Sequence, residues 1–439
     1  MDRRLHILVE QCADHPTASI PEACGDWAST KAAYRFFSNE KVTHPAILAA
    51  HRSTCLERVA DESFLLVVQD TTSFDFTDHS YTTDLGPLEH AHRRGFFVHT
   101  GLAVNLQGVP LGILDQRIWS RDPDTVGKTR HRKELPIEQK ESYKWLQTLR
   151  ASLVDVSREI CVVTVADREA DVFDLFTEAE KQHTHLLIRS AWKRKLTDPP
   201  DTYLPDAVAQ TPVRGRLEVE VRRSDEHLPR RATCALRFTP VTVNPPKHRL
   251  RESGLHPIPL YAVEVREEHT PQGATPLHWL LLTTMSVTSF DDAQRCVQWY
   301  QYRWLVERYH FVLKSGCHLE DRQLRKRARL ERCLGVYAIV AWRLLWLTYR
   351  ARATPNVSCT VALDTPEWQA LYCYIHKTPI PPTEPPTLHQ AIRWIAQLGG
   401  FLGRKSDGEP GVKVLWRGWI RLDTITQSWL LFHPPQTCG

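Results

Sequence analysis

The segment FLLVVQDTTSFD, at residues 64–75, decides the fold of this chain because it joins a buried strand to a candidate functional carboxylate. Its first five residues are an unbroken apolar run bounded by polar residues, which is typical of a strand buried on both faces. Asp70 follows this run closely. We therefore expect Asp70 at the end of a central strand.

The segment ICVVTVADREADVFDLF, at residues 160–176, repeats this design. Residues 160–165 predict a second strand, Asp167 comes just after it, and a helical pattern starts at Glu169. Ligands of open α/β sheets collect at the ends of the strands, and burying an unpaired Asp is costly. The two aspartates are therefore better candidates for function than for packing.

A third segment, WYQYRWLVERYHFVLKSGC at residues 299–317, predicts one half-buried helix. Tyr300, Arg303, Glu307 and Lys314 would fall within an arc of about 60° on one face of that helix, opposite an apolar band. A carboxylate between two cations and beside a tyrosine suits a metal, phosphates and an unstacked base. Taken alone, however, the stripe favours an ordinary solvated face, because Arg and Glu four residues apart often pair on helices.

Three carboxylates from two strand ends and one helix form a hard, all-oxygen set of ligands. Such a set suits Mg²⁺ or Mn²⁺, which bind through a few carboxylates together with waters and phosphate oxygens. Two such ions about 4 Å apart can activate an attacking oxygen and stabilise the leaving one. The chemistry implied is cutting or exchange of phosphodiester bonds.

The sequence resembles the cut-and-paste bacterial transposases of the insertion sequence four family, which carry an Asp, Asp, Glu (DDE) triad on a ribonuclease H-like core. The mark of that family is Tyr, two residues, Arg, three residues, Glu, six residues, Lys. Tyr300, Arg303, Glu307 and Lys314 match it without a gap. Four phrases also resemble family motifs in the family's order, so the resemblance covers nearly the whole chain: QDTTSFD at 69–75, KESYKWL at 140–146, ADREAD at 166–171 and LGGF at 398–401.

The resemblance implies that Asp70, Asp167 and Glu307 are the catalytic triad and bind two Mg²⁺ or Mn²⁺ ions. The enzyme would nick one strand at a transposon end, and the freed 3′ hydroxyl would attack the opposite strand to give a hairpin. Water would open the hairpin, and the same hydroxyl would then attack target DNA. The implied partners are the inverted-repeat ends, the target DNA and a second copy of the chain in a synaptic homodimer.

The resemblance also implies roles in DNA binding. Tyr300, Arg303 and Lys314 would hold the DNA end near its 5′ phosphate, and Trp279, in HWLLLTT, would stack on a flipped base. Read from the residues alone, Trp279 is better explained as a core residue on a strand, and only the resemblance favours base stacking. Arg189, at the end of a predicted strand, is a weaker candidate for DNA contact and is about as well explained by a structural ion pair.

Two other classes of function remain open at this stage. A metal-dependent nuclease on the same core would cleave DNA without joining it, and would need neither Tyr300 nor Trp279. A regulator derived from a transposase would bind DNA or dimerise without catalysis. An intact triad argues against such a loss of catalytic activity.

Composition agrees with a large DNA-binding protein but does not identify it. The chain has 439 residues, 42% hydrophobic content and a net charge of +5, so a DNA surface must come from local clusters. Basic clusters occur at residues 128–133, 193–195, 247–251 and 322–332. Each is as typical of a solvated surface as of a DNA contact, and the last is the best candidate.

Cysteine usage and the absence of apolar spans indicate the compartment. The 11 cysteines show no CxxC pair, which argues against a zinc ribbon or a secreted disulfide framework. The amino terminus lacks an apolar signal core, and no apolar stretch reaches the ~18 residues of a membrane span. We expect a cytoplasmic protein without a membrane partner, associated with the nucleoid when bound to DNA.

The order of predicted elements gives an α/β fold class, a ribonuclease H-like core with a mixed sheet flanked by helices. Strands at 96–105 and 110–119, a helix at 144–153 and a strand at 185–189 complete that core around the two aspartate strands. We expect five regions: a helical DNA-binding region at 1–60, the first part of the core at 61–190, an inserted β subdomain at 191–290, the catalytic helix at 291–320 and a C-terminal helical region for dimerisation at 321–439. The chain begins closer to its first motif than family members usually do, which predicts that a first DNA-reading helix is missing. The C-terminal region could instead be a helical cap over the core.

Overall fold

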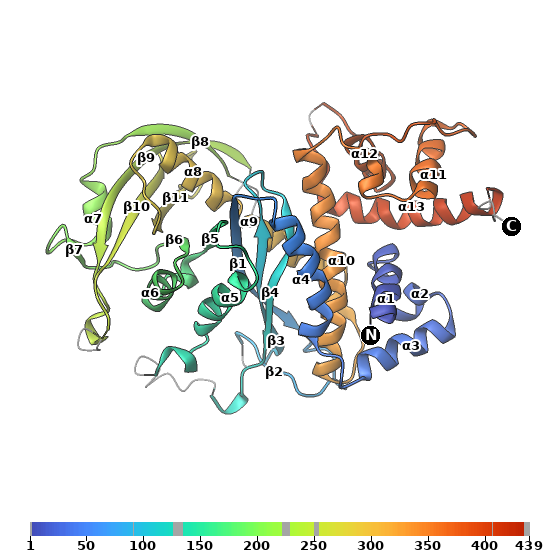
Figure 1. Ribbon diagram of the computed structural model, residues 1–439, viewed down its shortest axis with the longest axis horizontal. Coiled ribbons are helices and arrows are strands. Elements are labelled where there is room, and N and C mark those ends of the chain that lie inside the picture. Colours follow the sequence, from blue (N-terminus) through green and yellow to red (C-terminus); the bar gives the residue numbers. More distant parts are fainter. Residues whose placement is uncertain are drawn as a thin grey trace.

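The computed structural model describes residues 2–90, 92–125, 135–221, 229–249, 254–405 and 407–433. A mixed sheet flanked by helices forms one half of the molecule, and the two helical terminal regions form the other half (Figure 1). This is the predicted ribonuclease H-like α/β class with N-terminal and C-terminal helical regions. The fold class is therefore confirmed.

Four helices precede the sheet: α1 (Asp2–Asp14), α2 (Ile20–Cys24), α3 (Trp27–Ser38) and α4 (His44–Val59). The first turns of α3 and α4 are capped by short polar side chains. The Asp26 side chain accepts a hydrogen bond from the Ser29 N–H at the start of α3, and Thr43 caps α4 by accepting from the Ala46 N–H.

The core follows the predicted order of strands and helices. Its elements are β1 (Phe64–Asp75), β2 (Gly86–Pro87), β3 (Arg94–Val104), β4 (Pro110–Trp119), α5 (Tyr143–Leu153), β5 (Cys161–Ala166), α6 (Phe173–Gln182) and β6 (His185–Arg189). β1, β5 and β6 are parallel neighbours, whereas β3 runs antiparallel to β1 and β4 antiparallel to β3. The parallel strands read as continuous apolar runs because both of their faces are covered.

The inserted segment extends the core sheet. It contains β7 (Leu196–Asp198), α7 (Leu204–Ala209), β8 (Gly215–Val221), β9 (Arg230–Val243), β10 (Ile258–Glu267) and β11 (His278–Thr283). β11 pairs antiparallel with β6, so among the described residues all these strands belong to one sheet with the path β2-β3-β1-β5-β6-β11-β10-β9-β7. The alternating pattern in the sequence correctly predicts strands here, but only the pairing shows that they continue the central sheet.

The remaining elements are helical: α8 (Phe290–Gln301), α9 (Trp304–Phe311), a π turn (Val312–Gly316), α10 (Arg327–Ala353), α11 (Thr365–His376), α12 (Leu388–Leu398) and α13 (Val412–Phe432). α10 stands between the sheet and the terminal helices (Figure 1) and packs against α1, α3, α4, α12 and α13. In the part of the chain that the structure describes, no helix is both long and apolar enough to cross a membrane.

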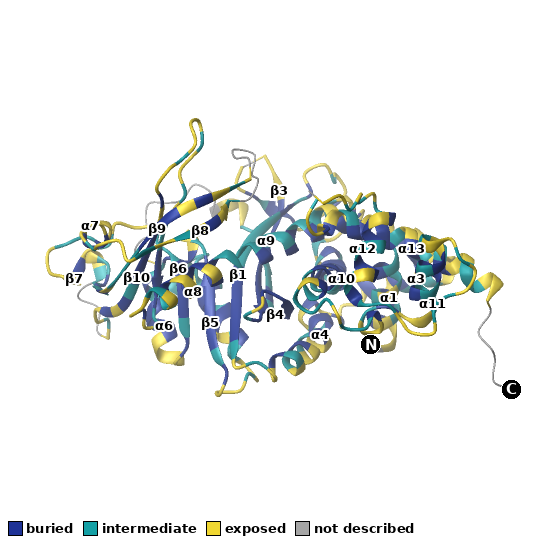
Figure 2. Ribbon diagram, turned by 90° about the horizontal axis from the view of Figure 1, so that it is seen from above, coloured by how far each residue is buried: buried dark blue, intermediate teal, exposed yellow. Residues whose placement is uncertain are grey.

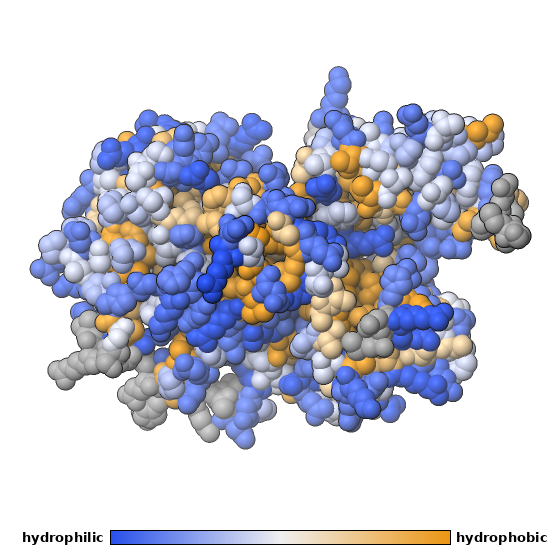
Figure 3. All heavy atoms as spheres, in the orientation of Figure 1, coloured by the Kyte–Doolittle hydropathy of each residue, from blue (hydrophilic) through white to orange (hydrophobic). Residues whose placement is uncertain are grey.

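The main core cluster lies between the sheet and the helices α8 to α10. Leu66 and Val68 of β1 belong to it, together with Val163 and Val165 of β5 and Val306 of α9. These strands are dark in the burial view, and exposed residues lie mainly on the outer loops and helices (Figure 2). Hydrophobic atoms also gather near the middle of one face, while its outer parts are mostly hydrophilic (Figure 3).

Candidate active site

Asp70, on β1, and Asp167, directly after β5, lie at matching positions along two adjacent parallel strands. The β1–β5 ladder ends with Val68 opposite Val165, and each aspartate follows two residues later in extended backbone. Side chains two residues apart on a strand share a face, and Val68 and Val165 face the core cluster that contains α9. Both carboxylates therefore lie on the α9 side of the sheet.

The prediction that Asp70 ends its strand is wrong. β1 continues to Asp75, because β3 goes on pairing with it, with Thr100 opposite Asp70 and Gly95 opposite Asp75. What ends near Asp70 is the parallel ladder with β5. The polar residues after the apolar run are strand residues whose partner lies on β3, which local composition does not show.

Helix α9 carries Glu307 close to the two aspartates. The helix packs against β1 and β3. One turn after Glu307, the His310 Nδ1 lies 3.7 Å from Asp70 Oδ2. The structure therefore brings all three predicted catalytic residues to one place.

The protonation of these carboxylates reflects their burial and their neighbours. Burial raises the pKa of Asp167, the Glu169 N–H that its carboxylate accepts lowers it, and Asp70 raises it again. Burial raises the pKa of Glu307, Arg303 lowers it, and both aspartates raise it. The three carboxylates thus repel one another, a situation that a bound divalent cation relieves.

The residue types fit a divalent metal, although their present arrangement does not. In the described ranges, no group of three or more His, Cys, Asp or Glu side chains is placed so that it could hold one ion. The Glu307 carboxylate instead forms an ion pair with Arg303. An all-carboxylate donor set still suits Mg²⁺ or Mn²⁺.

Residues 299–317 do not form the single predicted helix. α8 ends before Tyr302, α9 begins after Arg303, and a π turn follows α9. At the junction the backbone bonds tighten, since the Arg303 N–H donates to the carbonyl oxygen of Tyr300, only three residues earlier. The Tyr302 hydroxyl donates to the Leu106 carbonyl oxygen in the β3–β4 turn, which holds the bend against the sheet.

Because of this bend, the predicted stripe is divided. Tyr300 was expected on the open face, but it is only 4% exposed. It lies near Asp167, which together with burial raises the pKa of its hydroxyl, while Arg303 and Arg189 lower it. Arg303 remains between Tyr300 and Glu307.

Lys314 lies further along β1 than the carboxylates. Its Nζ is 5.3 Å from the centre of the Phe74 ring and 3.8 Å from Glu320 Oε1. Phe74 comes four residues after Asp70, roughly 13 Å further at the usual rise of a strand. Lys314 therefore lies on the same side of the sheet as the triad, but further along β1, near Phe74.

Trp279 and Arg189 gather around Tyr300. The Trp279 ring, half-buried on β11, meets the Tyr300 ring edge-on with 5.0 Å between ring centres. Arg189 Nη2 donates to the His278 carbonyl oxygen at 2.9 Å. The Arg189 Nε is buried without a hydrogen-bond partner within the described residues. The structure thus groups these two candidate DNA contacts beside Asp167.

Two sets of polar residues near the site were not predicted from the sequence. His310 lies three residues after Glu307, and this helical spacing could have indicated a shared face. Asp171, in the quoted phrase ADREAD, is fully buried and paired with Arg194, with further bonds from the Ala191 and Trp192 N–H groups. Its partners follow β6, so the pairing could not be read from the local sequence.

The basic cluster at 322–332 is partly structural. The Arg322 guanidinium donates to backbone carbonyl oxygens of Pro16, Ala18 and Cys317, and Arg332 donates to those of Phe37 and Val42. These two arginines join the N-terminal helices to the rest of the chain, and DNA contact by this cluster stays a prediction. The cluster at 128–133 lies outside the described residues, as does part of the cluster at 247–251.

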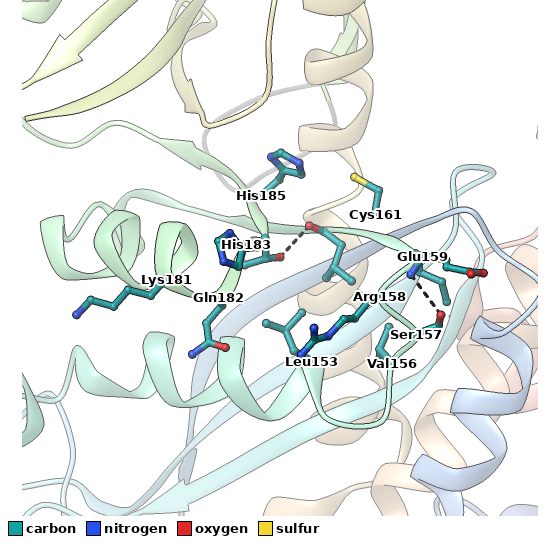
Figure 4. Close-up of a pocket in the computed structure, with 13 residues that line it drawn as sticks. Leu153, Val156, Ser157, Arg158, Glu159, Cys161, Lys181, Gln182, His183 and His185 are labelled. Carbon is teal, nitrogen blue, oxygen red and sulfur yellow. Dashed lines mark hydrogen bonds between the residues drawn. The ribbon is translucent and has the colours of Figure 1, made fainter.

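A cavity of about 830 Å³ lies at the opposite ends of the parallel strands. Its lining includes Ile160 and Cys161 at the start of β5, and Thr184 and His185 at the start of β6 (Figure 4). The two aspartates lie beyond the other end of the parallel ladder. The cavity is therefore separate from the candidate site.

Three family models match successive parts of the chain. They are a transposase DNA-binding model over residues 1–42, a transposase DDE domain over 144–343 and a Tn5 transposase dimerisation domain over 339–428. The DDE match contains Asp167 and Glu307, and Asp70 precedes it. These matches indicate DNA binding, metal-dependent cleavage and strand transfer of DNA in general, and dimer formation. The chain belongs to the DDE transposases, with a domain set that is consistent with the insertion sequence four family.

Proposed function

We propose that Asp70, Asp167 and Glu307 catalyse the cleavage of transposon ends and their transfer into target DNA. The observation that carries this proposal is the placement of the two aspartates on adjacent parallel strands beside the Glu307 helix. Such a convergence of carboxylates is costly for stability, because Asp70 raises the pKa of Asp167 and both aspartates raise that of Glu307, and it is best explained by function.

We further propose that the three carboxylates hold two Mg²⁺ or Mn²⁺ ions. When bound, such a pair supplies an activated attacking oxygen and a stabilised leaving oxygen for in-line displacement. Glu307 would turn from Arg303 toward the aspartates. The freed Arg303 guanidinium would then be available to a DNA phosphate, which its planar fork suits.

The proposed DNA contacts follow the site. Arg303 and Lys314 would bind phosphates at two positions along β1, which position the DNA end without reading its sequence. Tyr300 would support them close to the 5′ phosphate. Trp279 would stack on a base flipped out at the hairpin end, and Arg189, beside Tyr300, would offer a further DNA contact.

The proposed reaction is a series of exchanges at phosphorus. Water attacks one strand and releases a 3′ hydroxyl, which attacks the opposite strand to give the hairpin. A second water opens the hairpin, and the same 3′ hydroxyl attacks target DNA. Each step breaks one P–O bond and forms another, so no oxidant or energy donor is needed.

The proposed assembly is a homodimer that holds two inverted-repeat ends and one target DNA. In this scheme residues 1–60 bind DNA, 61–190 and 291–320 form the catalytic core, 191–290 are the inserted strands, and 321–439 form the dimer contact. The DNA-binding and dimerisation matches at the two ends of the chain support that arrangement.

The first experiment compares Asp167→Ala with Glu169→Gln. Both residues lie in one loop, but the Glu169 carboxylate points to Lys144 at the surface. Asp167→Ala should abolish Mg²⁺-dependent nicking of a plasmid that carries the element's ends, while DNA binding persists. Glu169→Gln should nick like the parent protein. Unchanged nicking by Asp167→Ala would refute the proposed role.

A strand-transfer assay separates the alternatives. Labelled end DNA incubated with a target plasmid should give hairpins and joined products. Cleavage without joining would favour the nuclease, and DNA binding without either product would favour the inactive regulator.

A further inference from the structure

A buried polar network reaches the candidate site from β3 and β4. His310 is 4% exposed, and its Nδ1 lies 3.7 Å from Asp70 Oδ2. Its other ring nitrogen, Nε2, lies 3.1 Å from the Thr100 hydroxyl. Thr100 is fully buried and stands directly opposite Asp70 in the β1–β3 ladder. The imidazole of His310 thus lies between Asp70 on β1 and Thr100 on β3.

The network continues through Gln116 to helix α4. The Gln116 amide donates to the Thr100 hydroxyl at 3.0 Å and to the Tyr309 hydroxyl at 3.1 Å. Its carbonyl oxygen lies 2.9 Å from His44 Nε2. His44 begins α4, so the network joins the helical N-terminal region to the sheet and to α9.

The bonds at Thr100 are compatible with a His310 ring that carries its proton on Nδ1. The Thr100 oxygen accepts from Gln116, and its own proton can be donated to His310 Nε2. In this tautomer the Nδ1 proton faces the Asp70 carboxylate. At 3.7 Å this pair is longer than a hydrogen bond, and such pairs commonly tighten when a site is loaded.

We propose that His310 is a positioning residue that orients the Asp70 carboxylate for divalent-cation binding. This inference rests on the proposed function of Asp70. Helix α9 then carries both the proposed ligand Glu307 and, three residues later, His310, which orients the second proposed ligand, Asp70. Outer contacts of this kind set the orientation of a metal ligand and contribute to metal affinity.

The test uses two variants that each preserve one end of the imidazole. In His310→Asn the side-chain N–H occupies the position of Nδ1 and can still reach Asp70. In His310→Gln the amide nitrogen occupies the position of Nε2 and reaches Thr100 instead. The readout is Mn²⁺ affinity of the full chain without DNA, followed through the electron paramagnetic resonance signal of free Mn²⁺.

We expect His310→Gln to weaken Mn²⁺ binding about tenfold, and His310→Asn to stay within about threefold of the parent protein. His51→Gln is the matched control, since His51 is also a buried histidine but accepts from the Ile113 N–H and faces Trp342. It should leave Mn²⁺ affinity unchanged. Thermal unfolding of each variant confirms that it is folded.

Asp70→Ala distinguishes failure of this inference from failure of the proposed function. If Asp70→Ala loses Mn²⁺ affinity while His310→Gln binds like the parent protein, the positioning role is overturned and the metal site stands. Equal weakening by the Asn and Gln variants would also overturn it, because packing alone would explain the loss. If Asp70→Ala binds Mn²⁺ normally, the proposed metal site itself fails.

Discussion

Arg303 forms an ion pair with Glu307, one turn further along α9, so a candidate DNA contact occupies a candidate metal ligand. Burial lowers the pKa of Arg303, but Glu307, Tyr300 and Asp70 together raise it above its ordinary value. The guanidinium is therefore held charged within a site of carboxylates. Binding of DNA phosphate to Arg303 and of a divalent cation to Glu307 would separate the pair.

The first prediction concerns Arg303→Ala. Removing this cation should weaken binding of end DNA and reduce the slope of log affinity against log salt by about one, the amount for one phosphate contact. Mn²⁺ affinity should not fall, because Glu307 loses a competitor. Fluorescence anisotropy over a salt series measures the slope. Arg295→Ala, which removes an exposed arginine that pairs with Asp292 on α8, should leave the slope unchanged. An unchanged slope for Arg303→Ala would contradict the proposed contact.

The second prediction concerns pH. Burial lowers the pKa of His44 to about 4, with an opposing contribution from its bond to Gln116, and burial and Arg58 lower that of His51 to about 3. Below pH 6.5, the ordinary pKa of histidine, His44 and His51 are protonated in the unfolded chain but stay neutral in the folded chain. Each group therefore contributes stability that is present above pH 6.5 and is lost as the pH falls toward its folded value, by up to about 1.4 kcal/mol per pH unit.

His51→Gln checks this sign, because glutamine does not titrate. Urea unfolding at pH 7, 6 and 5 should show a shallower loss of stability in the variant than in the parent protein. The exposed His6 serves as the control, and His6→Gln should follow the parent curve. Parallel curves for His51→Gln and the parent protein would contradict the assignment of His51 as a buried neutral group.

The third prediction concerns the buried pair of Asp171 and Arg194. Asp171→Ala would leave the Arg194 charge and two backbone N–H groups without their acceptor, which should lower the free energy of unfolding by about 3–5 kcal/mol. Chemical denaturation measures the change. Glu169→Ala, which breaks an exposed pair in the same loop, should cost no more than about 1 kcal/mol. Similar costs for the two variants would show that Asp171 is not a structural anchor.

The fourth prediction concerns the close contact between α12 and α13. A Cβ at Gly418 would lie 1.7 Å from the Ile395 carbonyl oxygen, and backbone cannot move aside as a flexible side chain can. Gly418→Ala should therefore destabilise the C-terminal helices by about 1–3 kcal/mol or more, seen as a lower Tm. Gly411→Ala is the control, since nothing lies within 4 Å of its added carbon. Equal melting of the two variants would mean that the helices can separate without cost.

Much of the core could be predicted because its signals are local. The apolar runs before Asp70 and Asp167 correctly predict the central strands, since strands covered on both faces need continuous apolar residues. The predicted helix at 144–153 and strand at 185–189 also agree with the structure. The apolar pattern that defines each of these elements involves residues close together in the chain, so it can be recognised in the sequence.

Other features could not be predicted because they depend on distant partners. The length of β1 is set by its pairing with β3, and the bend between α8 and α9 is held by the contact of Tyr302 with Leu106. Helical periodicity alone could not show that Tyr300 would be buried beside Trp279.

By itself, the sequence determined the residue types, their spacing and the strands that carry the two aspartates, because these follow from local chemistry. Tertiary structure alone decided that His310 approaches Asp70 and that Tyr300 lies buried beside Trp279. The bond between His310 and Thr100 joins residues 210 positions apart. Such contacts form only when the α9 segment returns to the first strands of the sheet, and the packing of the whole core determines where it lies.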